Sequence, residues 1–233
     1  KVGLVIAKHM DVDVLLTVVD RAHFTVMQTF DGRRITRAIY NVRNNRNQFL
    51  RLTMPKGSEI WSATVAGRAT QPAKDAEGRV LLPLVRSEGR SGMSAFPVEI
   101  VYAETGTKPD ARGRGTARID LPSCSEPIMH MMVNLHVPED GRYRDFEGSL
   151  RPVKNFTPVA GARIAAIQGP QGNQVAQQLQ SAFVQHNQAR VAKAGASPIE
   201  VQLPISGSVH RFEKILIVKG EEWLSYTYTG LER

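Results

Sequence analysis

Short stretches in which apolar and polar residues alternate, each closed by a turn, most constrain the fold of this chain. An extended strand points successive side chains to opposite faces, so alternation predicts strands with one buried face. In residues 34–43, Ala38 and Tyr40 fall on one face. Arg37 and Arg43 fall on the other. Strands are predicted in the same way at residues 23–30, 34–43, 49–54, 60–66, 80–85, 96–103, 116–121, 128–137, 148–153, 199–204, 210–218 and 223–229.

The spacing of these strands predicts a mainly β fold of antiparallel β-sandwich type. A length of 233 residues suits one large domain or two modest ones. Residues 105–115 are polar and rich in glycine, which is typical of a connection between domains. We therefore expect two tandem sandwiches, residues 1–106 and residues 116–233, joined by a linker at residues 107–115.

One helix is predicted inside the second domain, as part of an insertion at about residues 157–197. Asn173 can cap its first turn, and residues 174–194 contain neither proline nor glycine. An apolar stripe at helical spacing consists of Val175, Leu179, Ala182 and Phe183. Such a stripe is typical of a helix that lies on a sheet, and a helix that binds a partner is the alternative.

The second half repeats the order of strand and turn signals of the first half. A strand that ends at Pro55 and Gly57 corresponds to one that ends at Pro138 and Gly141. A Leu-Pro strand and a closing strand with tyrosine follow in both halves. Because proline ends strand pairing and glycine permits the turn, the shared order predicts an internal duplication, with the second copy enlarged by the helical insertion.

Three segments of the first half follow one another in a distinctive order. They are Ile-Tyr-Asn-Val-Arg-Asn at residues 39–44, Leu-Arg-Leu-Thr-Met-Pro-Lys-Gly at residues 50–57 and Val-Ala-Gly-Arg at residues 65–68. Together they resemble the core of VIT-type β-sandwich domains, which occur in large secreted or envelope proteins. The resemblance implies a non-enzymatic scaffold beside an adhesion domain. The Asp-x-Ser-x-Ser metal motif of adhesion domains is absent from this sequence.

The net charge of +8 comes mainly from arginine. Arginine suits planar recognition of phosphate and carboxylate groups. No nucleic-acid motif or strip of stacking aromatics accompanies the charge, so a nucleic-acid partner is not favoured. Solvated strand faces are the favoured explanation of the arginines. The residues that we predict to contact a partner are Arg37, Arg43, Arg51, Gln177, Gln185 and Arg190.

Residue types that carry chemistry are present but scattered. His130 and His136 share one face of a methionine-rich strand, but roughly 20 Å of strand would separate them, so they cannot share a metal ion. Cys124 has no helix N-terminus beside it that would activate a thiol. The six histidines do not fall at metal-binding or triad spacings. We therefore expect no catalytic, metal-binding or cofactor-binding residues and no cofactor.

These observations predict a non-catalytic structural or protein-interaction module, an ectodomain fragment of a larger bacterial envelope protein. Its partner would be another protein or neighbouring domains of the parent chain, in the periplasm or outside the cell. No apolar run approaches the roughly 20 residues of a membrane span, so no membrane contact is expected within this segment. Two alternatives remain. One is a sandwich that binds carbohydrate or another ligand through Trp61, Tyr143 and Trp223, and the other is a hydrolase on a β-scaffold.

Overall fold

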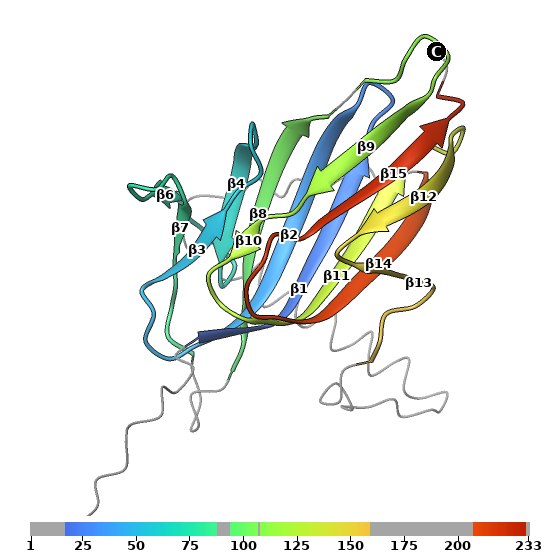
Figure 1. The fold of residues 1–233 in the computed structure, drawn as a ribbon. Helices are drawn as coiled ribbons and strands as arrows, with labels where there is room; N and C mark the ends of the chain where they lie inside the picture. Colours follow the sequence, from blue (N-terminus) through green and yellow to red (C-terminus); the bar gives the residue numbers. More distant parts are fainter. Residues whose placement is uncertain (1–16, 88–93, 107, 159–206, 232–233) are drawn as a thin grey trace, which may run out of the picture.

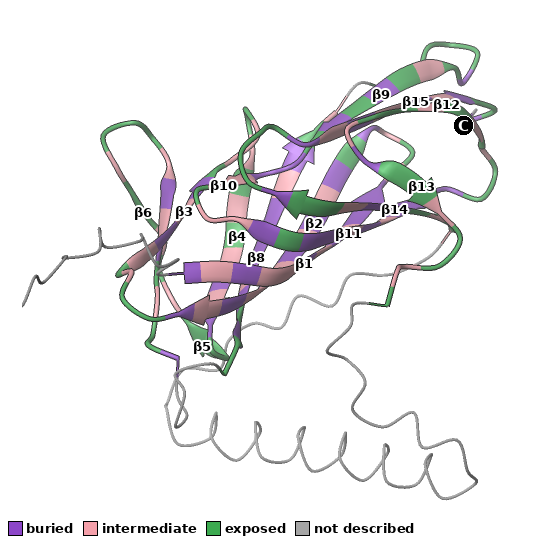
Figure 2. Ribbon diagram, turned by 60° about the horizontal axis from the view of Figure 1, so that its bottom comes forward, coloured by how far each residue is buried: buried purple, intermediate pink, exposed green. Residues whose placement is uncertain are grey.

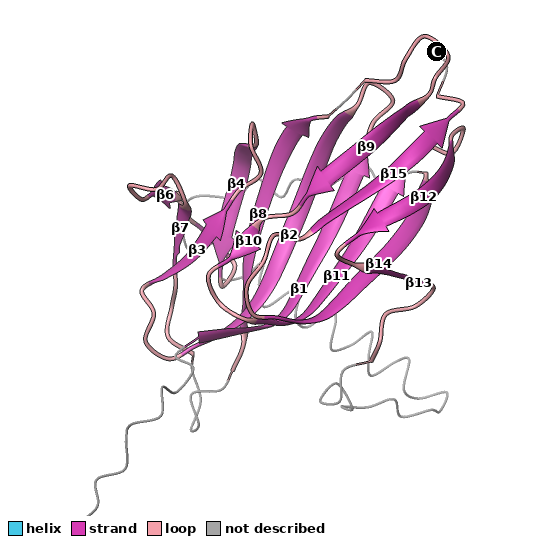
Figure 3. Ribbon diagram, viewed as in Figure 1, coloured by secondary structure: helices cyan, strands magenta, loops and turns pink. Residues whose placement is uncertain are grey.

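The computed structural model describes residues 17–87, 94–106, 108–158 and 207–231, and this part of the chain consists of strands and loops (Figure 3). None of these residues lies in a helix that could cross a membrane. The strands are β1 (Thr17–Gln28), β2 (Arg33–Asn44), β3 (Phe49–Thr53), β4 (Glu59–Val65), β5 (Arg68–Ala69), β6 (Ala73–Lys74), β7 (Val80–Pro83), β8 (Phe96–Thr105), β9 (Gly115–Asp120), β10 (Ser123–Cys124), β11 (Ile128–Val137), β12 (Arg142–Gly148), β13 (Arg151–Val153), β14 (Ser208–Ile217) and β15 (Trp223–Thr229).

The strands form three sheets. The large sheet has eight strands in the order β13-β14-β11-β1-β2-β8-β4-β5. A four-stranded sheet has the order β10-β3-β7-β6, and a three-stranded sheet has the order β12-β15-β9. Both smaller sheets lie on the same side of the large sheet (Figure 1). The described residues therefore form two layers, as expected for a sandwich-like β fold.

One hydrophobic core lies between the layers and includes residues from all three sheets. Ala38 and Tyr40 of β2 are fully buried in it, which confirms the face predicted from the alternation. Leu50 of β3 and Tyr226 of β15 bring in the two smaller sheets. The buried positions alternate along the strands of the large sheet, because only one of its sides faces the core (Figure 2).

The arrangement of two separate tandem sandwiches is not confirmed. Strand β1 of the first half pairs in parallel with β11 of the second half, in the middle of the large sheet. Strand β10 of the second half pairs with β3 of the first half in the four-stranded sheet. Parallel strands need a long connection, so pairing of this kind is not visible in local sequence signals. The predicted helix at residues 174–194 lies outside the described residues.

The strands that the predicted duplication matches occupy different layers. Strand β3 belongs to the four-stranded sheet, but its counterpart β11 belongs to the large sheet. Strands β4 and β8 belong to the large sheet, whereas β12 and β15 belong to the three-stranded sheet. The repeated signals therefore reflect similar strand ends rather than equivalent positions in one fold.

One predicted face is wrong at Trp61. The alternation places Trp61 on the same side as Ala63 and Val65, which are indeed buried. Trp61 itself is 49% exposed. The pairing of β4 with β8 shifts between Ile60 and Ser62, so Trp61 is the extra residue of a β-bulge and points away from the core.

Candidate interaction surface

The side of the large sheet that faces away from the smaller sheets is here called the outer side. Arg37 and Arg43 of β2 lie on it, opposite the buried face of that strand. The Arg37 guanidinium donates two hydrogen bonds to Glu99 of β8, at 2.8 and 2.9 Å. The Arg43 Nε donates to Asp20 of β1 at 2.9 Å. These two predicted contact residues thus share one surface, where ion pairs hold their side chains in place, and their role in binding stays a prediction.

The other predicted contact residues do not join them. Arg51 lies on β3 in the four-stranded sheet, in the opposite layer from the outer side. Gln177, Gln185 and Arg190 lie outside the described residues. Arginine clustering and a glutamine-rich helix predict these residues, and neither pattern shows which layer a strand joins.

A buried carboxylate lies on the outer side near the β13 edge of the large sheet. Glu213 of β14 is fully buried and accepts hydrogen bonds from His130 of β11 at 3.1 Å and from Arg151 of β13. The Thr157 backbone N–H and hydroxyl also donate to it, at 2.8 and 2.6 Å. We call Glu213, His130, Arg151 and Thr157 the Glu213 cluster. It ties the chain that follows β13 to the two strands beside it.

The electrostatics of the Glu213 cluster favour the ionised carboxylate. Burial would raise the pKa of Glu213, but the side-chain and backbone hydrogen bonds of Thr157, with those of Arg151 and His130, lower it to about 2. Hydrogen bonds to the charged form stabilise that form. His130 and Glu213 are buried side by side, with side chains 2% and 0% exposed.

Glu213 does not stand out in the sequence. Its position in an alternating strand was visible, but its partners are 56 to 83 residues away in the chain. A second contact on the outer side, between Asn134 Nδ2 and His23 Nε2 at 2.8 Å, was equally hidden. Burial, and secondarily the Arg37 charge, lowers the pKa of His23. A neutral His23 can accept the hydrogen bond from Asn134.

Exposed apolar side chains gather where β11 begins and β14 ends. We call this group the apolar strip; its members and their exposed fractions are Met129 (42%), Ile215 (53%), Leu216 (55%) and Val218 (59%). Strand pairing brings them together, because His130 pairs with Ile215 and Ile128 pairs with Ile217. Exposed apolar side chains that lie close together in strand register are typical of a contact surface.

The backbone around the apolar strip is also unusual. Among the described residues, β13 pairs with only three residues of β14, Arg211, Phe212 and Glu213. Within the described part of the chain, residues 214–217 therefore lie on a sheet edge, and an unpaired strand edge can accept another chain. Leu216 has a φ of 58°, a left-handed conformation that costs a residue with a side chain roughly 1–2 kcal/mol. Residues held in this way cluster at contact and functional sites.

The three aromatic residues considered for ligand binding do not form one platform. Trp61 lies on β4 of the large sheet. Tyr143 of β12 packs inward against Tyr226, and its hydroxyl donates to the Pro138 carbonyl at 2.8 Å. Trp223 of β15 is covered by the Arg118 guanidinium, 4.2 Å from its ring centre. A sugar-stacking surface would need such rings on a single face.

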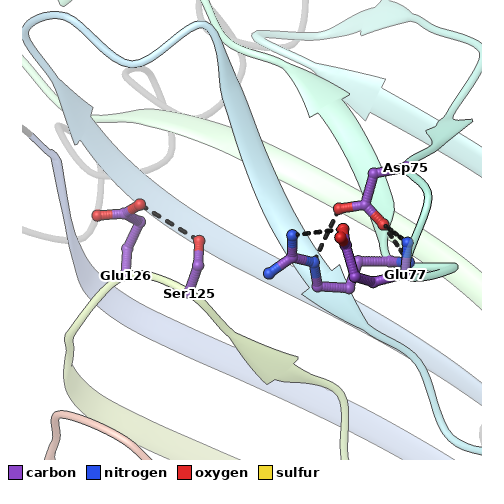
Figure 4. Close-up of polar contacts among 5 residues, drawn as sticks. Asp75, Glu77, Ser125 and Glu126 are labelled. Atoms are coloured by element: carbon purple, nitrogen blue, oxygen red, sulfur yellow. Dashed lines mark hydrogen bonds and ion pairs between the residues drawn. The ribbon is translucent and has the colours of Figure 1, made fainter.

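The thiol of Cys124, the hydroxyl of Ser125 and the carboxylate of Asp75 form hydrogen bonds with residues close to them in the sequence. Burial raises the pKa of the Cys124 thiol to about 12, although the Glu126 backbone N–H opposes this shift. Figure 4 shows that the Ser125 hydroxyl donates to Glu126, and that Asp75 and Glu77 lie in a separate turn. These contacts join residues one or two positions apart, so they stabilise turns rather than assemble a catalytic group.

A shallow pocket of about 380 Å³ lies at the tip of the β1–β2 hairpin. The two carboxylates that line this pocket accept hydrogen bonds from residues of the turns in which they lie. Asp31 accepts the Thr29 hydroxyl, and Asp110 accepts the backbone N–H groups of Arg112 and Arg114 at 2.9 and 2.8 Å. Within the described ranges, no three histidine, cysteine or acidic side chains are placed to hold a metal ion.

No protein-family profile matches this chain, and no curated protein matches it. Solved structures with similar backbones include leukotriene A4 hydrolase from Saccharomyces cerevisiae, with 8% identity, a TM-score of 0.44, and coverage of 90% of this chain and 29% of that chain. An M1 zinc metallopeptidase from Deinococcus radiodurans has 11% identity, a TM-score of 0.42, and coverage of 91% of this chain and 42% of that chain. The chain thus spans less than half the length of these solved chains. The resemblance to VIT-type domains stays a prediction.

Proposed function

We propose that this chain is a non-catalytic interaction module that packs against another domain of a larger protein. The observation that carries this proposal is the apolar strip at the edge of the large sheet. Four apolar side chains that are each 42% to 59% exposed lie close to one another in strand register there, beside residues that form a strand edge within the described part of the chain. Covering this strip would remove apolar surface from water, which favours association.

The outer side suits the rim of such an interface. Its arginines are already oriented by Glu99 and Asp20, so little side-chain entropy is lost when a partner binds. Polar, partly exposed groups around an apolar centre are typical of protein interfaces. A bacterial envelope origin and a periplasmic or extracellular location belong to the same proposal. The sequence of the parent protein on both sides of this segment tests them.

The experiment compares hydrogen exchange in the isolated chain and in the full parent protein. We expect the amides of residues 214–218 to exchange more slowly in the parent protein, because the neighbouring domain covers the apolar strip. Equal exchange of these amides in both forms would contradict the proposal.

A substitution separates docking from stability. Ile215→Lys in the parent protein should restore fast exchange of residues 214–218, because a lysine ammonium resists burial in an apolar contact. Val85 is similarly exposed, at 43%, but lies in the loop after β7, so Val85→Lys is the matched control and should leave this exchange unchanged. The same two variants of the isolated chain should unfold at the temperature of the unsubstituted chain.

A further inference from the structure

A second polar cluster lies inside the core, on the side of the large sheet that faces the smaller sheets. Two neighbouring cross-strand pairs of β2 and β8 form it: Arg34 with Glu104, and Thr36 with Tyr102. All four residues are more than nine-tenths buried. Buried polar groups normally have hydrogen-bond partners, so each exception calls for an explanation.

The contacts of Glu104 are poor for a buried carboxylate. Arg34 Nη2 lies 3.4 Å from Glu104 Oε1, whereas charge-assisted hydrogen bonds are usually about 2.7–2.9 Å long. Glu104 Oε2 has no hydrogen-bond partner among the described residues. Arg34 also donates to the Arg118 carbonyl of β9, so its guanidinium is shared between the two layers.

The elements packed against Glu104 add little compensation. Strand β9 brings Asp120, whose like charge disfavours a second anion. Strand β15 brings Tyr226 near Arg34, and the Tyr226 hydroxyl donates to Gln28 of β1 at 2.6 Å. Arg34 is thus the one cation that the described residues direct at Glu104.

The hydrogen bonds of Glu104 can be compared with those of Glu213 in the same sheet. Both carboxylates are buried, but Glu213 accepts from His130, Arg151 and twice from Thr157. A buried charge is tolerated when hydrogen bonds satisfy it and is costly when they do not. The two glutamates therefore have opposite preferences for the proton.

We propose that Glu104 is a proton-binding site of the core, which takes up a proton before Glu213 does as the pH falls. Burial raises the pKa of Glu104 above its ordinary value of 4.5; the Arg34 charge opposes this shift and the Asp120 charge adds to it. A pKa that is higher in the folded chain means that the folded state holds the proton more tightly. The resulting stability is present below pH 4.5 and is lost as the pH rises through the folded pKa.

An NMR titration of the assigned side-chain carboxyl carbons tests this directly in the intact chain. We expect the midpoint of Glu104 to lie above its ordinary value of 4.5, and Glu213 to remain ionised through the same range. A Glu104 midpoint at or below 4.5 would overturn the proposal, because it would show that Arg34 fully compensates the charge.

Thermal unfolding of the Glu104→Gln variant provides a second measurement. Because glutamine cannot take up the proton, the unfolding temperature of the unsubstituted chain should rise relative to that of the variant as the pH falls from 7 towards 4. Glu147→Gln is the control and should follow the unsubstituted chain at each pH. A gap between the Glu104→Gln variant and the unsubstituted chain that stays constant, or moves the other way, contradicts the inference. If Glu104→Gln does not fold, the titration of the unsubstituted chain decides.

Discussion

Glu213 accepts hydrogen bonds that link β14 to β11, to β13 and to Thr157 on the outer side. Replacing it by glutamine removes the charge that Arg151, His130 and Thr157 surround. Because hydrogen bonds to charged groups contribute more than neutral ones, we expect Glu213→Gln to lower the free energy of unfolding by about 2–3 kcal/mol. Urea denaturation at pH 7 measures this change. Glu147→Gln, on the exposed face of β12, should change it by less than about 0.5 kcal/mol.

The same residue sets a pH window for stability. The folded-state pKa of Glu213 is about 2, below its ordinary value of 4.5. A lowered pKa contributes stability that is present above pH 4.5 and is lost as the pH falls towards 2. The difference in stability between the unsubstituted chain and Glu213→Gln should therefore shrink over this window. A difference that is unchanged from pH 5 to pH 2 would assign the destabilisation to packing instead of charge.

Cys124 should be a slow thiol in the folded chain. Its pKa of about 12 leaves almost no thiolate at pH 8, and the thiolate is the reactive form. We expect a thiol-specific chromogenic reagent to react slowly with the native chain and rapidly in denaturant, as followed by absorbance. Equal rates in both conditions would mean that the side chain is accessible and ionised in the native fold.

At the scale of single elements, a glycine fixes the start of β14. Gly207 has a φ of 102°, and a Cβ atom there would lie 2.1 Å from the Val137 carbonyl oxygen of β11. Gly57 has a φ of 75° but open space around it. Gly57→Ala should therefore cost only the left-handed conformation, about 1–2 kcal/mol. Gly207→Ala should cost about 2–3 kcal/mol more, because the backbone of β11 or β14 must move. Equal losses in urea denaturation would show that the start of β14 adapts freely.

The strands themselves follow closely from the sequence. The predicted ranges 128–137 and 223–229 coincide with β11 and β15, because alternation and turn residues act over a few neighbouring positions. The face predicted for Trp61 is wrong. A bulge inserts one residue without changing the local alternation, so only the pairing partner β8 reveals it.

At the scale of the whole molecule, the two halves depend on each other. The β1–β11 pairing and the shared core lead us to expect that residues 1–106 and 107–233, expressed separately, lack cooperative unfolding transitions. Mixing them should restore the β-sheet circular dichroism signal of the intact chain. If each half unfolds cooperatively alone, the division into two tandem domains is correct after all.

The candidate surface was predictable only in part. The positions of Arg37 and Arg43 on one face follow from residue spacing, which is a local property. The Glu213 cluster joins β11, β13, β14 and Thr157, and nothing in a single sequence links residues so far apart. The apolar strip is hidden for the same reason, since only the pairing of β11 with β14 places the start of β11 beside the end of β14.

The sequence alone therefore determines that this chain is mainly β, where most strands run and which side of each strand is apolar. Those properties follow from steric preferences and burial patterns over a few residues. The tertiary structure alone decides that strands from both halves share one large sheet and that two buried glutamates have opposite surroundings. Strand order and charge environment depend on contacts between distant residues, and the free energy of burying a group depends on those contacts.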